Sequence, residues 1–96
     1  MTVSLLQILM EIPDCPSLKD KRRVVKSIKD KLIHRYKVSA AEVDLQDSHS
    51  FAQIGAALVS NSKDFGEKIL NKAFAFVEDN YPVRVVDYKI ITEFYG

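Results

Sequence analysis

The chain of 96 residues contains one cysteine, Cys15, and no tryptophan. A single cysteine cannot form an internal disulfide, which fits a reducing cytosol. It also excludes the paired C-x-x-C ligands of metal-carrying proteins, so we expect Cys15 to be a small, partly buried residue. Walker and dinucleotide-binding glycine patterns are absent, and no serine, histidine and aspartate set suggests a hydrolase. We therefore expect a protein that is not an enzyme and needs no cofactor.

The sequence also lacks a long hydrophobic run. Its apolar first segment, residues 1–11, has no basic leader and is interrupted by Gln7 and Glu11, so we expect neither a signal peptide nor a membrane span. No repeat, linker or low-complexity segment divides the chain, and its 47% hydrophobic and 28% charged residues are ordinary for a globular protein. We expect one domain over residues 1–96, located in the cytoplasm and without a membrane partner.

The stretch from Ser17 to Lys37 predicts a long amphipathic helix. Ser17 is a favourable N-cap, and Asp20 follows three residues later in a variant of the capping box. Apolar residues recur every three or four positions, which places them on one helix face. They are Leu18, Val24, Val25, Ile28, Leu32 and Tyr36.

This helix carries an unusual amount of positive charge. Nine of its residues are Lys or Arg and two are Asp, a net charge of +7, whereas the rest of the chain holds five basic and eleven acidic residues, a net charge of −6. Four of the cations lie in the first two turns, at the helix end that is itself partially positive, where each costs about 0.3–1 kcal/mol. Local conflicts of this kind without visible compensation tend to mark function.

We therefore predict that the first half of this helix binds an anion such as a phosphate group. The basic side chains would form a stripe that faces solvent, opposite the apolar face. The predicted contact residues are Ser17, Lys19, Lys21, Arg22, Arg23 and Lys26. The alternative is a solvated lysine-rich face without a ligand, since such faces are common.

Alternating apolar residues predict strands over residues 2–12, 38–45, 51–59 and 83–94. A second helix, capped by Asn61 or Ser62, runs to about residue 79. The order β-α-β-β-α-β predicts an α+β, ferredoxin-like sandwich, in which both helices cover one face of a four-stranded antiparallel sheet. Gly55 suggests a bulge or a close backbone approach, and Gly66 is a mild cost near the start of the second helix.

Two inward-facing sets follow from the spacing in the second half of the chain. In the second helix we expect an apolar stripe. It comprises Phe65, Ile69, Ala73, Phe76 and Val77. In the last strand the residues expected to share a face are Val86, Tyr88, Ile90 and Phe94.

The sheet face away from the helices is too apolar to be left in water comfortably. A homodimer through this face would cover it, and an adapter partner would do so equally well. The predicted interface residues are Val3, Leu5, Leu9 and Val59. Only Phe51 is aromatic among the open-face positions of the two central strands, so any RNA binding would use phosphates and the basic helix instead of base stacking.

A further set of polar residues surrounds the predicted hairpin between the second and third strands: Glu42, Asp44, Asp47 and His49. Carboxylates and imidazole could hold a divalent metal, but a surface strand with a polar turn explains them as well. We predict no metal site.

Several short motifs, taken together, resemble one family. They are Ser17-Leu18-Lys19, Lys21-Arg22, Val38-Ser39, Ala41-Glu42-Val43, Gln46-Asp47, Gly55 and Val59-Ser60-Asn61. These resemble the YlxP-like family of small bacterial proteins, whose domain has no known function. The resemblance implies a ferredoxin-like fold, a bacterial cytosolic setting, and genes beside those of translation and ribosome-maturation factors. It implies no activity and no catalytic residues. The chain departs from the family at Lys37, where asparagine is expected, and at Ser48-His49, in a loop that often holds tryptophan.

The leading functional hypothesis is thus a small, non-enzymatic RNA- or ribosome-associated binding protein that contacts phosphates with its basic helix. The alternative is a homodimeric interaction or adapter module that binds no nucleic acid.

Overall fold

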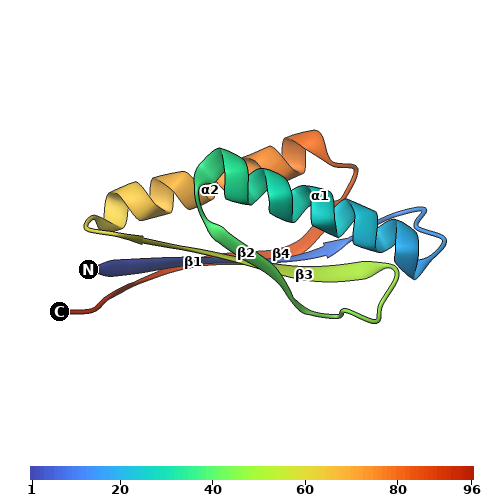
Figure 1. Ribbon diagram of the computed structural model, residues 1–96, viewed down its shortest axis with the longest axis horizontal. Helices are drawn as coiled ribbons and strands as arrows, with labels where there is room; N and C mark the ends of the chain where they lie inside the picture. Colours follow the sequence, from blue (N-terminus) through green and yellow to red (C-terminus); the bar gives the residue numbers. More distant parts are fainter.

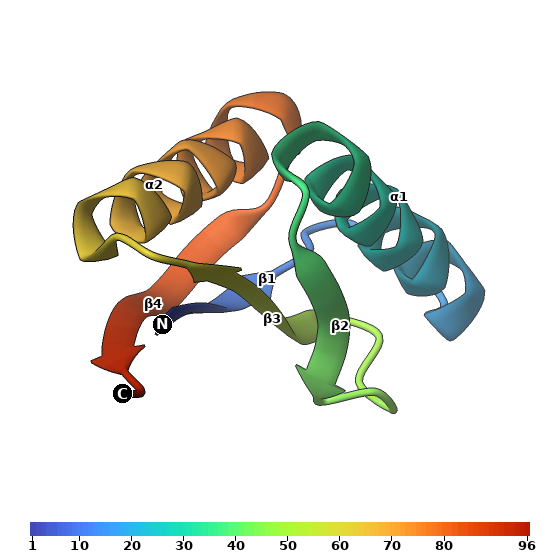
Figure 2. The ribbon, with the colours of Figure 1, turned by 60° about the vertical axis from the view of Figure 1, so that its left-hand side comes forward.

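Two helices lie side by side on one face of a four-stranded antiparallel sheet, and the other face is open (Figures 1 and 2). The computed structural model describes residues 1–96. The elements in chain order are β1 (Thr2–Glu11), α1 (Leu18–Tyr36), β2 (Ser39–Asp44), β3 (Phe51–Ser60), α2 (Lys63–Asn80) and β4 (Arg84–Phe94). The strand order is β2-β3-β1-β4, with every neighbouring pair antiparallel. The predicted ferredoxin-like sandwich is confirmed.

The hydrophobic core fills the space between the helices and the sheet. Alternate residues of β1 face it, and Leu6, Ile8 and Met10 are at most 1% exposed. Ile28 of α1 and Leu70 of α2 are fully buried above them. Neither helix has the length and apolar composition that a membrane crossing requires.

The ends of α1 follow from its capping residues. Ser17 Oγ accepts a hydrogen bond from the backbone N–H of Asp20 at 3.2 Å and donates one to the Asp20 carboxylate at 2.6 Å. At the other end Lys37 takes a left-handed conformation, with φ of 58°, and donates its N–H to Ile33 O. The helix predicted over residues 17–37 therefore forms with the predicted N-cap.

The buried side of α2 is rotated relative to the prediction. Phe65 was expected to face inward and is 53% exposed. Phe74 faces inward in its place, and its ring stacks on Tyr88 of β4 with centroids 3.9 Å apart. Apolar residues cover more than one stripe of this helix, so spacing alone does not fix which side meets the sheet. The buried residues are Gly66, Leu70, Ala73, Phe74 and Val77.

A β-bulge in β4 corrects a second prediction. Asp87 lies opposite Leu9, but Val85, not Val86, lies opposite Met10. Val86 is thus the extra residue and is 44% exposed, whereas Val85 packs against the core. Because side chains alternate between the two faces of a strand, the extra residue exchanges the faces of the β4 residues that precede it, relative to an uninterrupted strand.

Helix α2 approaches β1 most closely at Gly66. A Cβ atom on this residue would lie 2.2 Å from Ser4 Oγ and 3.0 Å from Ser4 Cβ. Ser4 is fully buried, and its hydroxyl forms a 3.0 Å hydrogen bond with Thr92 Oγ1. The glycine that costs the isolated helix stability therefore lets it pack directly on the sheet.

Candidate functional site

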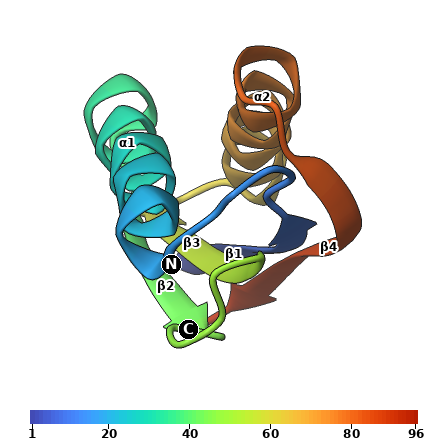
Figure 3. The same ribbon diagram turned by 90° about the vertical axis from the view of Figure 1, so that its right-hand side faces the viewer.

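The outer side of α1 carries a cluster of exposed cations, which we call the basic surface: Lys19, Arg22, Arg23 and Lys26. Helix α1 packs one side on the sheet (Figure 3). Helical spacing places the four exposed cations on the opposite side. Lys26 forms a 2.8 Å ion pair with Asp30, and both side chains are at least half exposed. This hydrogen bond raises the pKa of Lys26 and lowers the pKa of Asp30. The other three cations take part in no ion pair.

Lys21 does not belong to the basic surface, which corrects the prediction. Its side chain is fully buried, with Nζ 2.7 Å from Glu42 Oε2 of β2. The same ammonium donates a hydrogen bond to Leu45 O. Lys21 follows Leu18 by three residues and precedes Val25 by four, so helical spacing places it on the buried face. Helical spacing in the sequence could thus have identified Lys21 as a buried residue, although lysine is rarely fully buried.

Ser17, the remaining residue of the predicted anion site, has its hydroxyl occupied by hydrogen bonds within the protein. Its hydroxyl is bonded to both the N–H and the carboxylate of Asp20. That carboxylate already places a negative charge at the helix N-terminus, as the helix dipole favours. The structure thus reduces the candidate site to the four cations of the basic surface.

The hairpin between β2 and β3 is organised around Lys21. Glu42 faces α1 with its side chain 14% exposed, and Oε2 meets the charge of Lys21 without a hydrogen-bond geometry. Leu45 has a φ of 63°, a strained value for a branched side chain, and its N–H donates to Asp44 Oδ1 at 2.8 Å. The carboxylates of Glu42 and Asp44 are therefore engaged separately. Nowhere in the structure do three or more His, Cys, Asp or Glu side chains gather in a way that could hold a metal ion.

The open face of the sheet holds the other predicted site. Register places Val3 beside Val59, Leu5 beside Ala57 and Leu9 beside Gln53, so all four predicted interface residues lie on this face. Val59 is 65% exposed and Leu5 is 40% exposed.

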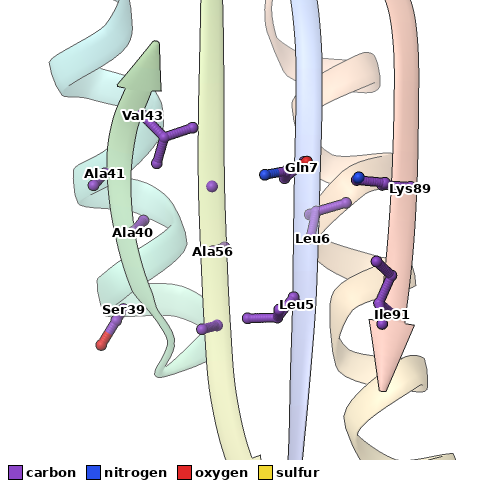
Figure 4. Close-up of a pocket in the computed structure, with 12 residues that line it drawn as sticks. Leu5, Leu6, Gln7, Ser39, Ala40, Ala41, Val43, Ala56, Lys89 and Ile91 are labelled. Carbon is purple, nitrogen blue, oxygen red and sulfur yellow. The ribbon is translucent and has the colours of Figure 1, made fainter. Parts of the chain in front are cut away.

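A depression of about 480 Å³ opens on this face; we call it the open-face hollow (Figure 4). Ala41 and Val43 of β2 lie on one side of it, and Leu5 and Ile91 lie on the other. At Gly55, where a bulge or a close backbone approach was expected, the near neighbour is a side chain: a Cβ atom there would lie 3.0 Å from Val43 Cγ1. The register shift beside it lies in β2, between Glu42 and Asp44. The hollow could not be predicted from local sequence patterns, because it depends on the alignment of all four strands.

Comparison with known proteins supports both the predicted family and the predicted fold. Residues 3–90 match the family described as "Protein of unknown function (DUF503)". The uncharacterized protein YlxP of Bacillus subtilis (strain 168) is 38% identical over 71 residues, which cover 74% of this chain and 76% of that protein.

Two designed proteins share the architecture at 10% identity. Foldit4 superimposes with a TM-score of 0.58 over the full length of both chains. LFR1 1, described as having a ferredoxin fold, superimposes with a TM-score of 0.54 over 97% of this chain and 84% of its own. These likenesses concern the fold alone. On the family match and the similarity to YlxP, the chain belongs to the DUF503 family of YlxP-like proteins.

Proposed function

We propose that this protein binds RNA, without catalysis, by placing the basic surface of α1 against the phosphate backbone. The observation that carries the proposal is the set of three exposed cations, Lys19, Arg22 and Arg23, that have no acidic partner within the protein. Lys26 is paired with the carboxylate of Asp30, whereas Lys19, Arg22 and Arg23 form no ion pair.

The spacing of the cations supports a polyanionic ligand. Residues three or four apart on a helix have Cβ atoms about 5–6 Å from one another, so Lys19, Arg22, Arg23 and Lys26 repel their neighbours. A solvated surface gains nothing from this repulsion, whereas a row of phosphates would relieve it and release bound counterions. Arg22 and Arg23 can also hold phosphate oxygens with two parallel hydrogen bonds each.

The open face supports phosphate contact over base reading. Among the open-face positions of the two central strands only Phe51 is aromatic, so the sheet offers no row of rings for stacked bases. Contacts to phosphate and sugar position a protein without reading sequence. The expected binding is therefore led by charge and shape, and the gene setting implied by the family resemblance favours RNA as the polyanion.

The test compares two variants with the same change in charge. In the first, Lys19, Arg22 and Arg23 are replaced by Gln; in the second, the exposed lysines of α2, Lys63, Lys68 and Lys72, are replaced by Gln. Binding to ribosomal RNA is measured across a salt titration. We expect the first variant to bind at least tenfold more weakly, and its salt slope to fall in magnitude by about 2–3, since each phosphate contact contributes about 0.7–0.9.

The α2 variant should keep the affinity and salt slope of the natural protein. Equal losses in both variants would show that total charge, not the basic surface, governs binding. Absence of binding at low salt would refute the proposal outright, as would an unchanged affinity in the α1 variant.

A second candidate function, an interaction module that binds no nucleic acid, is favoured by a different surface. The open face lies opposite the helices, and three of its apolar residues, Leu5, Val43 and Ile91, are each about two-fifths to one-half exposed. RNA binding and a protein contact at this face would not exclude one another.

A further inference from the structure

The two halves of the open face differ in side-chain size. One row across the sheet runs Ser39, Ala57, Leu5, Ile91 from β2 to β4, and the next row runs Ala41, Gly55, Gln7, Lys89. The half formed by β2 and β3 therefore carries small residues at the centre of the face, and the half formed by β1 and β4 carries larger ones (Figure 4). The result is a ridge beside a hollow.

We infer that a second copy of this chain covers the open face, related by a two-fold axis that runs along the strands between β3 and β1. This inference is independent of RNA binding. The axis places β1 and β4 of each copy over β3 and β2 of the other. Leu5 of one copy then lies over Ala57 of the second, and Ile91 lies over Ser39 at the side of the hollow. The contact is made twice and closes on itself, as an isologous interface must.

The shape of the face selects this axis over the alternative. A two-fold axis across the strands would place each hollow over the other hollow, and ridge would meet ridge. Such packing would leave voids whose lining atoms lose their dispersion contacts. Aligned sheets also pack about 10 Å apart with strands within about 30° of each other, which suits one interleaved layer of Leu and Ile.

The size of the face is adequate for a stable dimer. The four strands hold 10, 6, 10 and 11 residues. At a rise of about 3.3 Å per residue and a spacing of about 4.8 Å between strands, they give a footprint of roughly 600 Å². Side-chain relief increases the accessible area, and standard interfaces bury about 800 Å² per partner. The row that holds Leu5, Ala57 and Ile91 is mostly apolar, and the next row adds Gln7 and Lys89. The charged Glu11–Arg84 pair, with Nε 2.8 Å from Oε1, lies at the end of the strands.

The experiment exchanges the ridge and the hollow at one paired position. Leu5→Ala removes the ridge residue, and Ala57→Leu fills the position that receives it. Because the axis places Leu5 over Ala57 of the other copy, the double variant Leu5→Ala/Ala57→Leu restores a leucine over an alanine. Dimer dissociation constants are measured by sedimentation from micromolar to millimolar protein, and circular dichroism checks that each variant is folded.

We expect the natural protein to dimerise, each single variant to dimerise at least tenfold more weakly, and the double variant to come within about threefold of the natural protein, an energy difference below about 1 kcal/mol. A natural protein that is monomeric throughout this range would overturn the inference. So would single variants that dimerise normally, or a double variant in which the two losses simply add.

Discussion

Replacing Glu42 with alanine is expected to lower the free energy of unfolding by about 3–5 kcal/mol, because it leaves the Lys21 ammonium buried with one carbonyl acceptor. Lys21 is fully buried, and Glu42 Oε2 is the only opposite charge beside it, at 2.7 Å. The loss would be a large share of the 5–15 kcal/mol typical of a domain. Urea unfolding followed by far-UV circular dichroism measures it, since the chain has no tryptophan.

A double variant distinguishes the buried charge from simple loss of packing. Lys21→Met/Glu42→Leu removes both charges and keeps the volume, so it should recover most of the stability lost in Glu42→Ala. Lys26→Met breaks the exposed pair with Asp30 and should leave the urea midpoint almost unchanged. If Glu42→Ala were as mild as Lys26→Met, the buried ion pair would not hold the hairpin on α1.

Gly66→Ala is expected to destabilise the protein by a net amount of roughly 1–3 kcal/mol, after subtracting the gain of about 1 kcal/mol that alanine brings over glycine in a helix. The added Cβ would lie 2.2 Å from Ser4 Oγ and force the helix from the strand. Overpacking of this kind costs about 1–3 kcal/mol. Disturbing the hydrogen bond between Ser4 and Thr92 adds about 1 kcal/mol. Thermal and urea unfolding both report the change.

The matched control is Ala75→Gly, at an exposed position of the same helix, where only helix propensity should act, at about 1 kcal/mol. Combining Gly66→Ala with Ser4→Ala removes the hydroxyl but leaves the 3.0 Å contact with Ser4 Cβ. The pair should therefore show partial rescue, with a coupling energy above about 0.5 kcal/mol. A stabilising effect of Gly66→Ala alone would mean that α2 does not need this contact.

Elements with a single strong period were predictable from the sequence. Strand β1 has one side that is uniformly apolar and one that is mixed, and helix α1 has one dominant apolar stripe, so both their type and their inward face follow from spacing. Helix α2 is different, because Phe65, Phe74 and Phe76 point in several directions and the choice depends on Tyr88 of β4. The bulge at Val86 likewise depends on how β4 pairs with β1, which no local pattern records.

The candidate sites divide in the same way. Lys19, Arg22 and Arg23 could be placed on the outer side of α1 from the helical wheel alone, and the open-face residues of β1 followed from alternation. The role of Lys21 could not be completed from sequence, because its partner Glu42 lies on another element, 21 positions along the chain. The open-face hollow required the same long-range information.

The concentration of positive charge on one helix makes the molecule electrically one-sided, although its net charge is only +1. In buffer of about 0.01 M ionic strength the field of a charge extends about 30 Å, and at 0.15 M about 8 Å. The molecule measures 22 and 21 Å along its two shorter axes. In dilute buffer the electric field of α1 therefore extends beyond the molecule and acts on the orientation of a second molecule before the two touch. At physiological salt only charges within about 8 Å of each other interact appreciably. Because the net charge is close to zero, two copies repel each other little overall. In dilute buffer their relative orientation governs how they approach, whereas at physiological salt local contacts do.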